Sequence, residues 1–107
     1  MEKETEIELE DKRKVIVLQK RLNSGKRNRW IDDFTKAKLF GNQMNAEITS
    51  IAVMRESGVM KSIEKVTCNN QEIQFTMNDL QNLDPIEFDK LWSVFEDLMA
   101  VDEKKNP

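Results

Sequence analysis

The chain has 107 residues, 38% of them hydrophobic and 35% charged, with a formal net charge of −3, which suits a single domain spanning residues 1–107. It has no histidine and one cysteine, which excludes Ser-His and Cys-His nucleophile pairs, imidazole metal ligands, an intrachain disulfide and a thiolate zinc cluster. We therefore expect a protein that is not an enzyme and that binds no metal or cofactor.

The N-terminal region is predicted to form strands. Residues 1–4 are expected to be a flexible end, and Thr5–Leu9 alternates polar with apolar residues, which indicates an edge strand among acidic neighbours. The β-branched centre of Lys14–Arg21 predicts a second strand. The turn-forming residues Asn23-Ser24-Gly25 then predict a reversal into Arg27–Ile31, which gives an N-terminal β-hairpin.

A long helix is predicted next, from an N-cap at Thr35 to about Glu56. The pair Ser57-Gly58 predicts its end, because glycine readily adopts the left-handed conformation that follows a last helical turn. The apolar residues of this segment recur at helical spacing and form one stripe, namely Phe40, Met44, Ile48, Ile51 and Ala52.

A second, short hairpin is predicted between Val66 and Phe75, with Asn69-Asn70 as a two-residue turn. Asparagine tolerates the positive φ that such turns require. The expected register places the apolar side chains on one face. It pairs Cys68 with Gln71, Thr67 with Glu72 and Val66 with Ile73.

A C-terminal helix has a complete start signal. After a short helical turn capped by Thr76, Asp84 supplies an N-cap, Pro85 needs no hydrogen-bond partner at the first position, and Glu87 can reach back to the cap amide. Asp102–Pro107 is expected to be a flexible end. Together these elements predict an α+β domain with its two helices packed on each other and on the hairpins. The apolar stripe of the C-terminal helix is Phe88, Leu91, Trp92, Phe95, Leu98 and Met99.

Charge is distributed unevenly along the chain. Residues 1–11 contain six acids and one base, whereas residues 12–29 contain eight bases and no acid. Basic side chains can neutralise phosphates and Trp30 can stack on a base, so this segment is a candidate nucleic-acid surface. The alternative is a solvated face, or one paired with the acidic segment. The eight bases are Lys12, Arg13, Lys14, Lys20, Arg21, Lys26, Arg27 and Arg29.

Several other sites are excluded by spacing. Ser24-Gly25-Lys26 resembles the end of a phosphate-binding loop, but Lys20 and Arg27 stand where that loop requires glycine and serine or threonine. The adjacent carboxylates Asp32-Asp33 and Glu96-Asp97 point in different directions and predict no metal site. The longest runs without a polar residue have four residues, so no membrane span is expected, and we predict a cytoplasmic protein.

Flexible methionines and large apolar residues suit surfaces that accommodate apolar partners. The alternative for each of them is a place in the core. The predicted partner-binding set is Trp30, Phe40, Met44, Met54 and Met60.

Four parts of the chain follow one another in a recognisable layout. The apolar strand Val15–Leu18 leads to Ser24-Gly25-Lys26, and a second strand with Trp30-Ile31 leads to a helix capped at Phe34-Thr35. The short hairpin Val66–Phe75 follows, and then the pattern Thr-x-x-Asp-Leu … Leu-x-x-x-x-Phe-x-x-Leu, formed by Thr76, Asp79, Leu80, Leu83, Phe88 and Leu91. This layout resembles that of small bacteriophage tail assembly chaperones.

The resemblance implies a non-enzymatic assembly factor of the host cytoplasm. Such a protein binds and solubilises the tape measure protein and helps recruit tail tube subunits. Two other functions stay open, a small inhibitor or regulator and a nucleic-acid-binding protein, each acting through residues 12–29. Steep salt dependence of binding would favour these two, and salt-tolerant binding to a helical peptide would favour the chaperone. The oligomeric state stays open as well.

Overall fold

The computed structural model describes residues 2–40 and 50–100, and over these residues it has a four-stranded antiparallel sheet and four helices. The predicted α+β class is therefore confirmed. The strands lie in the order β1-β2-β3-β4. The elements are β1 (Glu2–Glu8), β2 (Lys14–Lys20), α1 (Ser24–Phe40), α2 (Ile51–Ser62), β3 (Ile63–Cys68), β4 (Gln71–Ile73), α3 (Met77–Gln81) and α4 (Pro85–Ala100).

The N-terminal hairpin consists of β1 and β2, so the predicted pairing of Lys14–Arg21 with Arg27–Ile31 is wrong. In the observed register Ile7 pairs with Val15. Residues 2–4, expected to be a flexible end, belong to β1. The predicted edge position is confirmed, and every second residue of β1 is an exposed glutamate. A row of like charges discourages this edge from pairing with another chain.

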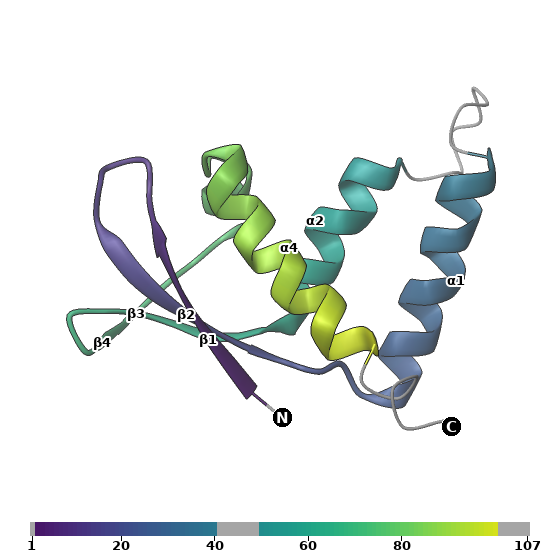
Figure 1. The fold of residues 1–107 in the computed structure, drawn as a ribbon, viewed down its shortest axis with the longest axis horizontal. Helices are drawn as coiled ribbons and strands as arrows, with labels where there is room; N and C mark the ends of the chain where they lie inside the picture. The colour runs from purple at the N-terminus through teal and green to yellow at the C-terminus, as the bar shows by residue number, and fades with distance from the viewer. Residues whose placement is uncertain (1, 41–49, 101–107) are drawn as a thin grey trace.

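One face of the sheet packs against α4 and forms the core. Val15 and Val17, alternate residues of β2, are 1% and 0% exposed, and they share the hydrophobic core with Leu91 and Phe95 of α4. The opposite face presents residues such as Ile16, 40% exposed, to solvent. Figure 1 shows α4 lying across the sheet and α1 at the far end of the molecule from the β1–β2 turn.

Asn23-Ser24-Gly25 begins a helix and is not a hairpin turn. The side-chain Oδ1 of Asn23 accepts a hydrogen bond from the backbone N–H of Lys26 at 3.0 Å and so caps α1. Turns and helix starts favour the same short polar residues, because both use them to satisfy local backbone groups. Thr35, the predicted N-cap, lies inside α1.

The predicted helix from Thr35 to Glu56 is wrong, because α1 and α2 are separate helices. Ser50 caps α2, with its side chain accepting from the backbone N–H of Val53 at 3.2 Å. Two residues of the predicted apolar stripe, Met44 and Ile48, lie outside the described residues.

Gly58 does not end α2, which continues to Ser62. Its φ is not positive, so left-handed backbone is not the reason for glycine here. Instead, two aromatic rings pack closely against this part of the helix. A Cβ atom at Gly58 would lie 2.7 Å from Nε1 of Trp30 and 2.8 Å from Cζ of Phe95, which is closer than side chains can approach. The glycine therefore provides space for the rings.

The predicted second hairpin is confirmed in its register. β3 and β4 pair Cys68 with Gln71 and Val66 with Ile73. The turn residues Asn69 and Asn70 have φ values of 53° and 66°, the left-handed conformation that this kind of turn requires.

The predicted helix starts near the C-terminus are confirmed, with one change. Thr76 and Asp79 form a reciprocal capping box on α3. Asp84 accepts from the backbone N–H of Ile86 at 2.9 Å at the start of α4. Glu87 does not serve the cap, because its carboxylate accepts from the backbone N–H of Glu8 on β1 at 2.9 Å. Residues 102–107 lie outside the described residues.

Candidate functional site

A cavity of about 270 Å³ lies between α1 and α4. Figure 1 shows the C-terminal end of α4 close to the start of α1, and the two helices diverge from there with α2 between them. We name this cavity the aromatic groove. It is lined by Arg27, Trp30, Ile31, Phe34, Trp92, Phe95, Glu96, Met99 and Ala100.

Four aromatic rings from the two helices contact one another in this groove. Trp30 stacks on Phe34 with centroids 4.7 Å apart and meets Phe95 edge-on at 4.9 Å. Trp92 stacks on Phe95 at 5.4 Å. Trp30 and Phe95 are 5% and 1% exposed and form the floor, whereas Phe34 and Trp92 are half-buried. The latter two rings therefore offer surface that a partner can cover.

Trp30 is held firmly in the floor. Its indole N–H donates to the backbone carbonyl of Met54 on α2 at 2.9 Å, and its ring lies against the helix at Gly58. A buried indole whose N–H has a partner is an anchor for packing. This contact sets the position of α1 relative to α2, and thereby one wall of the groove.

The α1 side of the groove is basic. A guanidinium Nη2 of Arg27 donates to the carbonyl of Met99 at 3.1 Å and closes the end where α1 and α4 approach each other. The ammonium group of Lys38 lies 5.5 Å from the centroid of the Phe34 ring, a cation–π distance.

The α4 side of the groove carries acidic residues. Glu96 contributes to the lining, and Asp89, one helical turn from Trp92, lies 3.5 Å from the Arg55 guanidinium of α2. That guanidinium also lies 4.7 Å from the centroid of Trp92 and fixes the orientation of this ring. Among the lining residues, α1 thus contributes one cation, Arg27, and α4 contributes one carboxylate, Glu96.

The structure divides the predicted partner-binding set. Trp30 and Met54, at 5% and 6% exposed, belong to the core, so neither presents a free side chain to a partner. Met60 is half-buried against the core, Phe40 is the last residue of α1, and Met44 lies outside the described residues. Of the three members whose side chains the structure describes, two are therefore core residues and one is half-buried.

The half-buried groove residues were not predicted as contacts. Phe34 follows Trp30 by four residues, so a helical reading of residues 24–40 would have placed both rings on one face. Trp92 was assigned to the core stripe of the C-terminal helix, because spacing alone does not show which part of a stripe another helix covers.

The eight bases of residues 12–29 do not form one surface. Lys12, Arg13 and Lys14 lie at the turn between β1 and β2, and β2, seven residues long, separates them from α1 by about 20 Å. Pairing with the acidic segment 1–11, the predicted alternative, is seen for Arg13 and for Lys20. Arg13 contacts Asp11 at 2.6 Å, and Lys20 contacts Glu2 at 3.5 Å.

These ion pairs affect two pKa values. The hydrogen bond from the Arg13 side chain lowers the pKa of Asp11 below its ordinary value of 3.8. The hydrogen bond to Glu64, 3.0 Å away, raises the pKa of Lys20 above its ordinary value of 10.5. Both changes stabilise charges that are already present at neutral pH, so neither creates an acid or a base for catalysis.

Residues 2–40 and 50–100 contain neither a group of metal ligands nor a helix that could span a membrane. No three histidine, cysteine, aspartate or glutamate residues there are grouped so that they could hold a metal ion. Within the same ranges, none of the helices has the length and apolar character that crossing a bilayer requires.

Comparison with known proteins does not assign the chain to a family. No family model matches it, and neither a curated protein nor a solved structure matches it significantly.

Proposed function

We propose that this protein is a non-enzymatic phage tail assembly chaperone that holds an amphipathic helix of the tape measure protein in the aromatic groove. The observation that carries the proposal is the groove itself, a hollow of about 270 Å³ between two helices with half-buried aromatic rings. Grooves of this kind take up the apolar face of a partner helix, whose anchors recur at every third or fourth residue.

The aromatic rings explain how such a helix would be held. Phe34 and Trp92 come from different helices and lie next to each other, with centroids 6.1 Å apart and ring planes tilted by 53°. The rings of Trp30 and Phe95, which contact them, are buried. Large apolar side chains of the partner would cover the two half-buried rings. Aromatic residues on a preformed, rigid floor are the usual dominant contributors to binding at protein interfaces.

The charges beside the groove favour one kind of partner helix in one orientation. Arg27 and Lys38 lie on the α1 side, and Glu96 lies on the α4 side. Consider a partner helix with acidic residues along one edge of its apolar face and basic residues along the other. Its acidic edge lies beside α1 and its basic edge beside α4 in only one of the two directions in which the helix can lie in the groove. Complementary charge of this type selects partners and sets register.

The tape measure protein as partner comes from the resemblance to tail assembly chaperones. Long helical proteins need their apolar faces covered until they assemble, and a small domain with an open groove can do this without chemistry. Within this proposal the chaperone acts in the host cytoplasm and releases the tape measure protein as tail tube subunits are recruited. A regulator acting through all of residues 12–29 is less well supported, because those bases are dispersed.

Co-expression with the tape measure protein of the same phage tests the proposal. The wild-type chain is expected to keep that protein soluble, and isolated helical peptides from it should bind in calorimetry. The variants Phe34→Ala and Trp92→Ala should weaken peptide binding about tenfold each while retaining the helical circular dichroism spectrum.

Ile86→Ala is the matched control, since Ile86 is an apolar residue of α4 that is 69% exposed and lies outside the groove. It should bind like the wild type. Groove variants that stay folded and still solubilise the tape measure protein fully would refute the proposal.

A further inference from the structure

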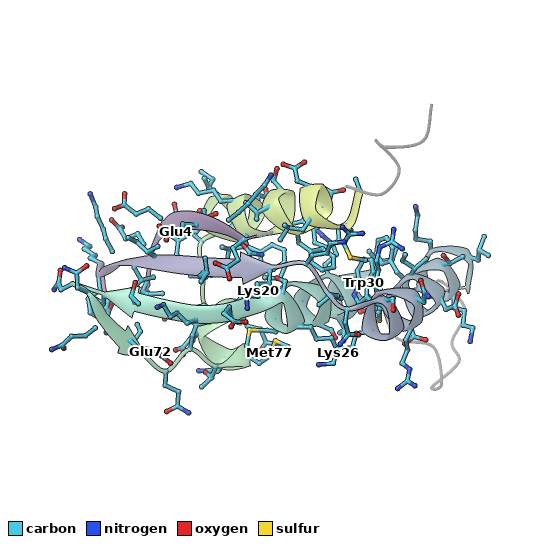
Figure 2. The ribbon with its side chains drawn as sticks, turned by 90° about the horizontal axis from the view of Figure 1, so that it is seen from below. Glu4, Lys20, Lys26, Trp30, Glu72 and Met77 are labelled. Carbon is cyan, nitrogen blue, oxygen red and sulfur yellow. The ribbon has the colours of Figure 1, made fainter. Side chains whose placement is uncertain are left out.

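A second hollow, of about 520 Å³, lies where α1 begins and α2 ends. We name it the basic hollow. Figure 2 shows Lys26 in the first part of α1, to the right of Glu72 in the view. The hollow is lined by Asn23, Gly25, Lys26, Arg29 and Lys61.

Over the part of the chain that the structure describes, the lining of the basic hollow carries three cations and no carboxylate. Lys26 and Arg29 come from α1, and Lys61 comes from the last turn of α2. None of the three has an ion-pair partner among the described residues, whereas Lys20, for example, lies between two glutamates. By contrast, the aromatic groove includes Glu96 among its lining residues.

This concentration of positive charge occurs in a chain with a net charge of −3. Like charges placed together without counter-ions raise the free energy of the folded protein and create a local positive potential. An anion bound in the hollow would offset that repulsion, because it can interact favourably with the three cations. This cluster of positive charges therefore favours an anionic ligand over an apolar one.

We propose that the basic hollow binds phosphate groups. Arginine offers a planar fork that matches two phosphate oxygens, and lysine offers a compact charge that can move to meet a third. Three cations suit two linked phosphates, as in a pyrophosphate group or in consecutive phosphates of a nucleic-acid backbone. None of the described residues that line the hollow is aromatic, so these residues would recognise the phosphates and not a stacked base.

The basic hollow and the aromatic groove use different sides of α1. Arg27 and Phe34 face the groove, whereas Lys26 and Arg29 face the hollow, as the helical repeat of 3.6 residues permits. The two sites can therefore be occupied independently, and the phosphate site does not depend on the proposed chaperone function.

Sequence reasoning could not find this site. Lys26 and Arg29 belong to the basic segment that was considered for nucleic-acid binding, but Lys61 is more than thirty residues away in the sequence. Only the packing of α1 against α2 brings the three together. The same packing leaves Lys12 and Lys14 at the other end of β2, outside the site.

Titration of the full chain with sodium pyrophosphate at constant ionic strength, followed by amide NMR spectra, tests the proposal. We expect saturable shifts at the amides of residues 24–29 and 61. The double variant K26Q/K61Q should weaken binding about fivefold or more, because it removes two of the three charges. K12Q/K14Q removes the same charge from the β1–β2 turn and should bind like the wild type.

Two further probes identify the source of the phosphate. If an octathymidylate binds much more tightly than pyrophosphate and shifts the same amides, the ligand is a nucleic-acid backbone. If pyrophosphate binds as tightly or more tightly, the ligand is a small phosphate compound. Both outcomes support a phosphate site, and W92A should retain it even where that variant loses binding to the helical peptide.

Three results would overturn the proposal. Shifts that rise linearly without saturation would show no site. Equal weakening by K26Q/K61Q and K12Q/K14Q would show a general effect of net charge. Binding of hexaglutamate as tightly as pyrophosphate would show that the hollow does not select phosphate.

Discussion

Replacing Gly58 with alanine is expected to destabilise the fold, although alanine is the better helix former. Gly58 lies within α2, where this substitution would ordinarily stabilise a helix by about 1 kcal/mol. The added Cβ would lie 2.7 Å from Nε1 of Trp30, against at least 3.4 Å for an ordinary contact, so about 0.7 Å of movement is required.

Neither ring beside Gly58 can move away without losing contacts that stabilise the fold. Trp30 is held by its hydrogen bond to Met54 and its stack on Phe34, and Phe95 is 1% exposed in the core. Overpacking of this kind costs about 1–3 kcal/mol. After the gain of about 1 kcal/mol in helix propensity, we expect a net loss of up to about 2 kcal/mol, which lowers the Tm of a domain of this size by about 4–8 °C for each kcal/mol lost.

Urea denaturation followed by circular dichroism and tryptophan fluorescence measures this change in the free energy of unfolding. Gly25→Ala is the control, because a Cβ there would meet only Oδ1 of Asn23, at 3.8 Å. That variant should be as stable as the wild type or slightly more so. A Gly58→Ala protein as stable as Gly25→Ala would refute the close packing of α2 against the two rings.

Two other predictions concern the ends of the sheet. Asn70→Val should destabilise the domain by about 1–2 kcal/mol in the same denaturation assay, because Asn70 has a φ of 66° that β-branched residues resist, and Asn70→Gly should not. Arg13→Ala should raise the pKa of Asp11 toward its ordinary value of 3.8, as followed by carboxyl NMR titration, since the hydrogen bond from the Arg13 side chain is the largest cause that lowers it. The hydrogen bond from the backbone N–H of residue 13 remains in the variant. Because the folded-state pKa is the lower one, the contact with the Arg13 side chain favours the folded chain above pH 3.8 and is lost as the pH falls through the lowered pKa. A carboxyl pKa that does not rise in the variant would contradict this account.

The parts of the fold that local signals determine were predictable from the sequence. The turn Asn69-Asn70 fixed the register of β3 and β4, since a two-residue turn leaves only one pairing that keeps the apolar residues on one face. The start of α4 followed from Asp84 and Pro85, whose preferences depend on the first turn alone. In both places the residues that decide the structure are neighbours in the chain.

The parts that depend on distant contacts were not predictable. Asn23-Ser24-Gly25 suits a turn or a helix start equally, and the burial of Trp30 against α2 favours the helix. Gly58 was interpreted as a helix end because its real function, space for two rings, depends on residues from α1 and α4. The burial of Trp30 and Met54, two residues of the predicted partner-binding set, depends on distant contacts in the same way.

The sequence by itself therefore determined the α+β class, the second hairpin and the C-terminal helix. The tertiary structure alone decided which apolar residues are core and which line a groove, and which bases share a hollow. The physical reason is the distance along the chain over which each kind of interaction acts. Turn and capping preferences act within a few residues, whereas burial and charge clustering are properties of surfaces that meet only when α1, α2 and α4 have packed together.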